Sequence, residues 1–419
     1  MKALVFGRPA PPQTGGADLP DGEIGDELDQ RLDRLPFGLF DVPDACLVRP
    51  DWVMTRPLLS GVCGSETKLI LGEFDAGDVD NPMAAFSSIP HVPGHEVVAE
   101  VVALGSAARG VEVGQRVLLN PWLTCGPRGV DPPCPACVAG DLNLCWSFTT
   151  GALGPGVHVG VATDAPGGWA DLMAAHDSML IPVPDSISDD VAVLADPFAV
   201  SLHAIVRHPP RSGGRALVYG AGALGATSVA ILRSLYPDVE VAVVARWRAQ
   251  AELATRFGAA LVLEPEPRSA LVEALASWSG GVLHAGYSGL PMAHPGGIDV
   301  VYDTVARPET LEVGVRVLAE RGVLVQTGVH TPGRWEYTPV YFKELSLVGS
   351  NAFGLEEVEG VRQHAIRHYL DLVQAKRVDL SGMLTHRFPL DRWHQAFRAL
   401  ADQGESGAVK VAFEPRSTA

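Results

Sequence analysis

The chain has 419 residues, of which 47% are hydrophobic, and its 49 acidic and 32 basic side chains give a formal net charge of −17. This length predicts two or three domains with a large core, and the composition excludes a largely disordered chain. The acidic balance disfavours nucleic acid and anionic membranes as partners, because both are bound through basic surface. The N-terminal apolar run is too short for a secretory signal, so we expect a cytoplasmic protein.

The segment 36–120 contains short apolar runs that are broken by Gly and Pro, a pattern that is typical of an irregular β domain. The clearest predicted strand is "EVVAEVVALG" at 96–105, and "GQRVLLN" at 114–120 is predicted to follow it. This part of the chain is therefore expected to be rich in β-structure.

Four of the six cysteines gather in the segment 125–145: Cys125, Cys134, Cys137 and Cys145. In a reducing compartment such a cluster, with its C-x-x-C pair, predicts a metal site rather than a disulfide framework. Four thiolates close a tetrahedral site, so zinc bound here would be structural. The alternatives are reduced surface thiols and a redox pair, which is disfavoured because "CPAC" does not lie between a strand and a helix.

The pattern of apolar and polar residues changes near residue 191. Apolar runs that predict buried strands occur at 215–220, 240–245, 259–264, 298–303 and 322–328. Helical spacing of apolar residues fills 248–258 and 307–322 between them. This alternation predicts a parallel sheet with helices on both faces. We expect one domain at 197–350, inserted between the two parts of another domain at 1–196 and 351–419.

The stretch "VYGAGALGATSVAIL" follows a predicted strand and opens a predicted helix. It places Gly220, Gly222 and Gly225 in G-x-G-x-x-G order, with Leu224 inside the motif. In that context glycines allow a tight turn and close approach to a pyrophosphate, which binds the helix N-terminus. Dinucleotide binding through these four residues is predicted. The alternative is a tight turn that binds no ligand.

The end of the next strand indicates which dinucleotide is bound. An NAD site usually has Asp or Glu there to accept hydrogen bonds from the ribose 2′-hydroxyl, but this chain has Ala245 followed by Arg246 and Arg248. Guanidinium groups favour a 2′-phosphate. We therefore predict that NADP(H) is preferred over NAD(H). The alternative is that both arginines are solvated.

Several motifs together resemble those of one family. Cys63-Gly64-Ser65-Glu66, Gly94-His95-Glu96, the cysteine cluster and "GAGALG" occur in this order in the zinc-dependent medium-chain dehydrogenase/reductase family. The likeness is closest to its polyol and threonine dehydrogenase branch, and it extends from the N-terminus to "GAVKVAF", apart from inserted segments. It implies an α/β protein in which a split GroES-like β-rich catalytic domain surrounds a Rossmann domain with a doubly wound parallel sheet.

The resemblance also implies a catalytic zinc. Cys63 and His95 match two of its ligands, and Asp196 in "VLADPFAVSLHAI" matches the third, with Glu96 as the other carboxylate that can bind. Thiolate, imidazole and carboxylate all suit zinc, and three protein ligands leave one position open for a substrate. Taken singly, Cys63 and His95 would be ordinary core residues.

Further roles follow from the same resemblance. Ser65 matches the hydroxyl that receives the substrate proton. Many relatives have a relay histidine where this chain has Lys68, whose high intrinsic pKa does not suit proton relay near neutrality. Lys68 is therefore expected to contact the cofactor or to be solvated. Glu66 and Arg116 are expected to support the metal ligands.

Other positions are expected to contact the cofactor or the substrate. The segment "QTGVH" resembles the one along the nicotinamide, which assigns Gly328 and Val329 to the cofactor, and Thr327 ends a predicted strand at the usual ligand crevice of a parallel sheet. Lys410 matches a basic position that reaches the pyrophosphate, and an exposed lysine is the alternative. Trp122 and Trp169 either line the substrate mouth or pack in the core.

The predicted activity is a zinc-dependent alcohol dehydrogenase. It would transfer a hydride between NADP(H) and a small-molecule alcohol or polyol, or its carbonyl counterpart. The alternatives are a zinc-free reductase of quinones or enones with the same fold and a non-catalytic NADPH-binding scaffold. Relatives imply a homo-oligomer, either a dimer or a tetramer. The sequence does not name the substrate.

Overall fold

The computed structural model describes residues 1–8, 28, 30, 32–71, 82–330 and 333–416. The chain divides into two compact units, the first formed by Met1–Asp196 and Leu384–Ala419 and the second by Pro197–Met383. Residues 351–383, which the sequence analysis assigned to the split domain, thus lie in the second unit. The domain boundaries drawn from the sequence stay a prediction.

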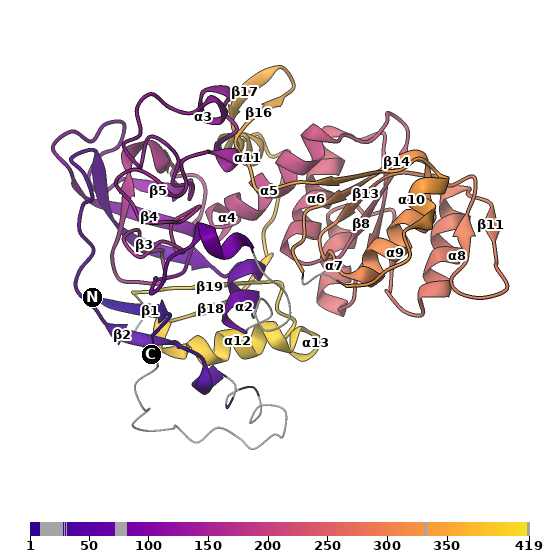
Figure 1. Ribbon diagram of the computed structural model, residues 1–419, viewed down its shortest axis with the longest axis horizontal. Coiled ribbons are helices and arrows are strands. Elements are labelled where there is room, and N and C mark those ends of the chain that lie inside the picture. Colours follow the sequence, from indigo (N-terminus) through magenta and orange to yellow (C-terminus); the bar gives the residue numbers. More distant parts are fainter. Residues whose placement is uncertain (9–27, 29, 31, 72–81, 331–332, 417–419) are drawn as a thin grey trace. The chain divides into compact units, whose positions relative to one another are not determined.

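The first unit is built on a mostly antiparallel sheet with the strand order β18-β19-β3-β4-β5-β7, and β6 pairs with β3 (Figure 1). Its strands are β3 (Trp52–Gly61), β4 (Glu96–Leu104), β5 (Arg116–Leu119), β6 (Met173–His176), β7 (Leu180–Pro182), β18 (Leu384–Phe388) and β19 (Lys410–Phe413). Strands β1 (Lys2–Phe6) and β2 (Phe37–Asp41) pair separately. The strands predicted at 96–105 and 114–120 are β4 and β5.

Apolar side chains from this sheet fill the interior of the first unit. One cluster of buried residues draws on β3, β4, β5 and β6. In a second cluster the Trp169 ring is fully buried and lies edge-on to Phe413, with ring centroids 5.0 Å apart. Trp169 is therefore a core residue. Short helices connect the strands: α2 (Gly64–Ile70), α3 (Pro135–Ala139), α4 (Asp189–Ala192), α12 (Trp393–Ala401) and α13 (Gln403–Ser406).

The second unit contains a parallel sheet with the strand order β10-β9-β8-β13-β14-β15. The strands are β8 (Arg215–Tyr219), β9 (Glu240–Val244), β10 (Leu261–Leu263), β13 (Ile298–Asp303), β14 (Leu318–Gln326) and β15 (Ser346–Gly349). The chain order reverses at β8, as in dinucleotide-binding folds. Successive residues of β8 and β9 point to opposite faces and are nearly all buried, so both faces of the sheet are covered.

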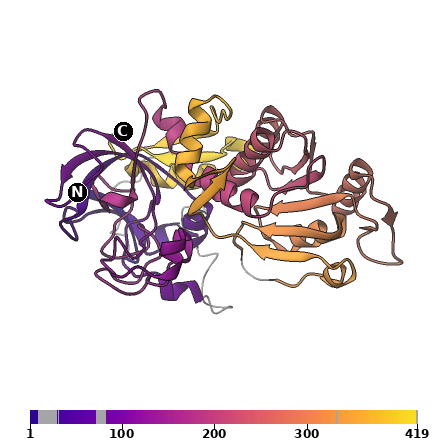
Figure 2. The same cartoon turned by 90° about the horizontal axis from the view of Figure 1, so that it is seen from above.

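The second unit also contains helices. They are α5 (Ala195–Arg207, which begins in the first unit), α6 (Ala223–Leu235), α7 (Arg248–Arg256), α8 (Arg268–Ser279), α9 (Pro308–Val317), α10 (Thr338–Phe342) and α11 (Ala365–Gln374). Of these, α6, α7 and α9 contact the strands of the sheet directly. Figure 2 shows helices on both sides of the strands. Two hairpins complete the unit, β11 (Leu283–His284) with β12 (Met292–Ala293) and β16 (Leu355–Val358) with β17 (Val361–His364).

The structure corrects one predicted helix. The helix expected at 307–322 ends at Val317, because Leu318 pairs with Ile298 and already belongs to β14. The remaining predicted strands of this unit are present, which confirms the predicted α/β fold with its parallel sheet. Among the described residues, none of the helices is both long and apolar enough to cross a membrane.

Candidate metal centres and cofactor site

The four clustered cysteines converge in the first unit. Cys134 precedes α3, Cys137 lies within it, and the sulfurs of all four lie within 4.8 Å of one another. The Cys145 sulfur is 3.7 Å from that of Cys125 and 3.9 Å from that of Cys134, and none of the four forms a disulfide. Tetrahedral zinc with Zn–S bonds of about 2.3 Å requires sulfurs about 3.8 Å apart. The geometry therefore fits zinc, with Cys125 included.

The protonation of these thiols supports the same interpretation. Burial alone would raise the pKa of the Cys134 thiol, but the Trp146 N–H and neighbouring thiols lower that pKa to about 6. Burial raises the pKa of Cys145 to about 11. Thiolates packed this closely repel one another, and a divalent cation removes that repulsion.

A second group of metal-binding side chains forms where α2 meets β4. Ligand atoms of Cys63, His95 and Glu96 lie within 4.8 Å of one another. Cys63 is the N-cap of α2, in extended conformation with φ −85° and ψ 151°, and His95 directly precedes β4. The structure thus brings together three residues that belong to two separate sequence motifs, one at Cys63 and one at His95 and Glu96.

Glu66 holds this group in place from the first turn of α2. Its Oε1 accepts hydrogen bonds from the Gly94 N–H at 2.8 Å and from His95 Nδ1 at 2.8 Å. Its Oε2 accepts from the backbone N–H of Cys63 at 3.0 Å. A carboxylate only accepts, so Nδ1 carries the proton and Nε2 of His95 is the nitrogen left for a metal.

The charges around His95 favour a cation. Burial by itself would raise the pKa of Glu66, but the adjacent His95 ring outweighs burial and lowers that pKa. Burial would lower the pKa of His95, but Glu66 and Cys63 raise it well above its ordinary value. A carboxylate and a thiol around one imidazole form a negative, largely buried site, which is the environment that a zinc ion stabilises.

Asp196 lies in the first turn of α5 and does not belong to the group formed by Cys63, His95 and Glu96. Its carboxyl group is buried, and its Oδ2 has no hydrogen-bond partner among the residues that the structure describes. Burial raises the pKa of Asp196 to about 7, with His95 and Glu96 among the charges that act on it. A buried carboxylate of this kind is a second potential ligand beside Glu96.

Lys410 is buried, although an exposed side chain was the alternative interpretation of this position in the sequence analysis. Its side chain is only 2% exposed, its Nζ forms an ion pair with Glu96, and it donates to the Val62 carbonyl at 3.0 Å. The exposed alternative is therefore wrong. Lys410 compensates the charge of Glu96, and its assignment to the pyrophosphate stays a prediction.

The predicted proton-transfer residues lie on α2. Ser65 is exposed in the first turn of the helix, two residues after Cys63, and Lys68 lies in its last turn with a half-buried side chain. Arg116, in contrast, donates to Asp189 at 2.6 Å and to the Pro184 and Ile187 carbonyls. It therefore holds the segment 184–189 rather than a metal ligand.

The structure adds His158, which the sequence did not single out. Its ring lies against the ring of His95, with centroids 4.6 Å apart, and edge-on to Trp122, with centroids 5.8 Å apart. Burial, followed by the effect of His95, lowers the pKa of His158 to about 3. Trp122, one of the two tryptophans considered for the substrate mouth, thus packs against His158. No sequence motif marks His158.

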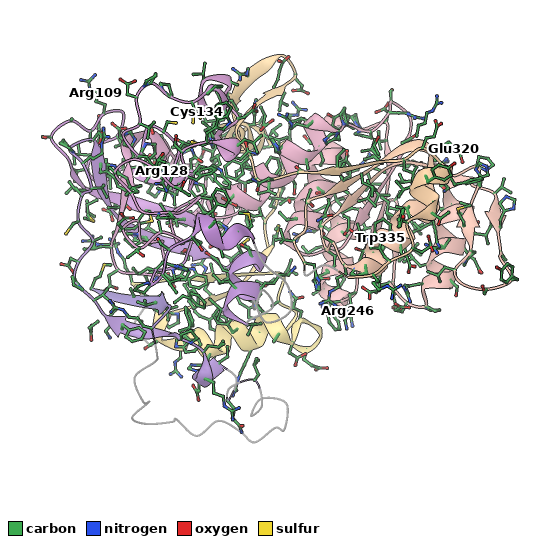
Figure 3. The ribbon with its side chains drawn as sticks, viewed as in Figure 1. Arg109, Arg128, Cys134, Arg246, Glu320 and Trp335 are labelled. Carbon is green, nitrogen blue, oxygen red and sulfur yellow. The ribbon has the colours of Figure 1, made fainter. Side chains whose placement is uncertain are left out.

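Arg128, which is labelled in Figure 3, anchors the loop 150–156. Its guanidinium is completely buried and has no carboxylate partner among the ion pairs of the described residues. Instead its N–H groups donate to main-chain carbonyls at distances of 2.6–3.0 Å, on Leu123, Thr150, Leu153, Gly154 and Gly156. These bonds use all five donors of an arginine. The loop 150–156 is therefore held through its backbone.

We expect Arg128→Met to lower the free energy of unfolding by about 3 kcal/mol or more, because several buried carbonyls lose their donor. Arg109→Met is the matched control, since the Arg109 side chain is exposed (Figure 3). Urea unfolding followed by circular dichroism measures both. Equal midpoints for the two variants would show that the five bonds contribute nothing.

The glycine motif forms the turn from β8 to α6 in the second unit. Gly220 has φ +95°, and a Cβ on Gly225 would lie 1.9 Å from the Gly220 carbonyl oxygen. Both positions therefore require glycine. Gly222 is the N-cap of α6, and a Cβ there meets nothing within 4 Å. The helix N-terminus is thus open to an anion, and Leu224 lies in its first turn.

The other predicted cofactor residues follow the ends of neighbouring strands. Arg246 comes two residues after β9, is exposed, and stacks over Trp247 at 4.7 Å (Figure 3). Arg248 instead forms an ion pair with Glu252 at 2.7 Å. Thr327 and Gly328 both donate backbone N–H groups to the Asp303 carbonyl, which leaves Val329 57% exposed beyond β14. These residues lie at the carboxyl edge of the sheet, where α/β folds bind ligands.

Two family models match the chain. The alcohol dehydrogenase GroES-like domain matches residues 49–185, and the zinc-binding dehydrogenase model matches residues 213–373. The (R,R)-butanediol dehydrogenase of Saccharomyces cerevisiae is 27% identical over 395 residues, which is 90% of this chain and 94% of that protein. The L-threonine 3-dehydrogenase of Pectobacterium atrosepticum is 26% identical over 362 residues, which is 85% of this chain and 86% of that protein.

Solved structures agree with these matches. A Sinorhizobium meliloti 1021 protein described as a zinc-binding dehydrogenase, solved bound to NADP, has a TM-score of 0.69 and 25% identity over 90% of this chain and 96% of that chain. The 2R,3R-butanediol dehydrogenase of Bacillus subtilis shares the fold, with a TM-score of 0.70 at 21% identity over 91% of this chain and 96% of that chain.

Both domain models match in the order that the resemblance implies, and the relatives align with most of the chain. These findings confirm the resemblance, and they support zinc and a nicotinamide cofactor. The chain belongs to the zinc-type medium-chain dehydrogenase/reductase family and is an alcohol dehydrogenase-type oxidoreductase.

Proposed function

We propose that this enzyme transfers a hydride between NADP(H) and an alcohol or polyol, or its carbonyl counterpart. The observation that carries the proposal is the convergence of Cys63, His95 and Glu96 within 4.8 Å, with Glu66 holding the other ring nitrogen of His95. We assign a catalytic zinc to this group and a structural zinc to the four cysteines. A zinc-free reductase would have no use for the first group.

The side chains have separable tasks in this proposal. When bound, zinc supplies Lewis acidity toward an alcohol or carbonyl oxygen, and nicotinamide supplies the hydride chemistry. Cys63 presents its sulfur from the N-cap of α2, and Glu66 orients His95 so that Nε2 faces the metal. The exposed hydroxyl of Ser65 takes the proton that the alcohol gives up.

Two carboxylates compete for the third ligand position. Glu96 belongs to the converged group, but its charge is compensated by Lys410. Asp196 has a buried oxygen without a hydrogen-bond partner among the described residues, a condition that a bound cation would relieve. We therefore keep both as candidate ligands. The homo-oligomeric state and the cytoplasmic location stay predictions.

The experiment that tests the proposal measures zinc per chain and turnover on the same preparation. Protein purified without added metal is expected to hold two zinc ions per chain and to reduce NADP⁺ with at least one member of a panel of secondary alcohols and diols. One zinc per chain and no turnover of any alcohol or carbonyl would overturn the proposal and favour the scaffold alternative.

The cofactor preference has a test of its own. Arg246→Ala is expected to raise the Kd of NADPH by roughly 10- to 100-fold and to change that of NADH by less than about threefold, because only NADPH carries a 2′-phosphate. Arg248→Ala is the matched control, since this side chain is already paired with Glu252. Binding is measured by quenching of protein fluorescence. Equal effects of Arg246→Ala on the two cofactors would refute the NADP(H) assignment.

A further inference from the structure

Arg246 is the first exposed residue after β9, and the backbone that carries it is held on both sides. The Val244 carbonyl accepts from the Gly220 N–H at 3.0 Å, and the Ala245 N–H donates to the Leu263 carbonyl at 2.9 Å. The first of these bonds ties the end of β9 to the glycine turn, where the pyrophosphate of a dinucleotide would bind. The base of the Arg246 side chain is therefore fixed beside the proposed cofactor site.

The guanidinium of Arg246, which is labelled in Figure 3, contacts an aromatic ring instead of a carboxylate. Its Cζ lies 4.7 Å from the centre of the Trp247 ring, and within the residues that the structure describes no hydrogen bond or ion pair involves Arg246. A stacked guanidinium turns its face to the ring and keeps the N–H groups of its edge for an anion. Arg246 is thus restrained while its donors can still bind a phosphate.

Trp247 is not a core residue and does not stabilise the helix that it begins. Its side chain is half-buried and is not among the buried apolar side chains of the core. It is the N-cap of α7, where Ser, Thr, Asp or Asn would accept a hydrogen bond from the first turn, but the indole N–H only donates and forms no cap. A residue that breaks a local rule in this way is expected to have another role. Its contact with Arg246 indicates which role.

We propose that Trp247 is a positioning residue that holds the Arg246 guanidinium against the 2′-phosphate of NADP(H). The proposal rests on the proposed function, because it requires a cofactor that carries this phosphate and binds at the glycine turn. Without the ring, the long arginine side chain would sample more rotamers and lose more conformational entropy when the cofactor binds. Discrimination between NADPH and NADH should therefore depend on an aromatic ring at position 247.

The test measures binding by isothermal titration calorimetry, so it depends on neither zinc nor turnover. The probes are ADP-ribose 2′-phosphate and ADP-ribose, which differ only in the 2′-phosphate. The wild type is expected to bind the phosphorylated probe at least about tenfold more tightly. Trp247→Leu is expected to raise the Kd of that probe roughly three- to tenfold and to leave the Kd of ADP-ribose within about twofold. Trp247→Tyr, which keeps a ring, is expected to restore most of the difference.

A second variant separates positioning from support of the helix. Trp247→Ser supplies a hydroxyl that can cap α7, so its midpoint of thermal unfolding should be no lower than that of the wild type. It should nevertheless lose discrimination between the two probes as Trp247→Leu does. If Trp247→Ser discriminates as well as the wild type, the ring has no part in binding the phosphate and the proposal is wrong.

The Arg246→Ala background shows whether the ring acts through the guanidinium. There Trp247→Leu should change the Kd of either probe by less than about twofold, because the group that it positions is absent. A larger effect in that background overturns the proposal. Equal weakening of both probes by Trp247→Leu alone also overturns it and indicates stacking on the adenine instead. Wild-type protein that binds the two probes equally means that the NADP(H) assignment has failed, and the role of Trp247 fails with it.

Discussion

Cys63→Ala is expected to lower kcat/KM by at least about 1000-fold for every alcohol that the wild type oxidises, because a site without its thiolate loses the metal that polarises the substrate oxygen. Zinc content should fall from two ions per chain to one. The midpoint of thermal unfolding should change little, since Cys63 is only half-buried and its replacement leaves a small cavity.

Cys46→Ala is the control for this variant. Cys46 is exposed and belongs to neither group of metal-binding side chains in the described part of the chain. Its replacement should leave zinc content, turnover and stability unchanged. Full activity of Cys63→Ala would remove the catalytic zinc from this position, whereas a joint loss of activity and folding would leave a structural role for the thiol.

Cys137→Ala is expected to have the opposite profile. It should also remove one zinc, but the midpoint of thermal unfolding should fall by about 10 °C, which corresponds to several kcal/mol for a unit of this size. The three remaining thiols lie within 4.8 Å of one another and would repel when ionised. Because Cys137 itself is only half-buried, lost packing would account for little of the change.

Differential scanning calorimetry and zinc analysis on the two variants separate the two centres. Activity of Cys137→Ala should survive at temperatures below its lowered midpoint. If this variant keeps both the wild-type midpoint and two zinc ions, the four cysteines are ordinary thiols and the structural zinc is wrong. The same experiment on Cys125→Ala asks whether the most distant member of the cluster in sequence is a ligand.

The sequence was sufficient to predict those parts of the sites whose residues lie within one short segment. The C-x-x-C pair, the glycine motif and the pairs at Cys63 and His95 each lie within a few residues, and local backbone geometry converts their order into a site. Apolar runs likewise predicted the strands of the parallel sheet. The family resemblance predicted that Cys63 and His95, which are 32 residues apart in the sequence, belong to one metal centre. The structure agrees, because their ligand atoms lie within 4.8 Å of each other.

What the sequence could not provide depends on contacts between distant segments. Lys410 meets Glu96 only because β19 and β4 both pair with β3, so its burial follows from the sheet and not from its neighbours in sequence. The predicted role of Arg116 beside the metal ligands was wrong for a similar reason, because the first of its hydrogen-bond partners, Pro184, lies 68 residues later in the chain. His158 lies in a loop without periodicity, and nothing in its local sequence points toward His95.

The anchoring of the loop 150–156 by Arg128 has a consequence for how the enzyme can diverge. Every one of its hydrogen bonds ends on a main-chain carbonyl, so the side chain of Thr150 takes no part in the anchor, whereas Gly156 is restricted to glycine because a Cβ there would lie 2.6 Å from the Cβ of Ala162. A point change at the exposed Thr150 can therefore alter the surface of this loop while the path of its backbone is preserved. An insertion or deletion would instead break the match between donors and carbonyls, and relatives that retain this arginine should differ here in composition rather than in length.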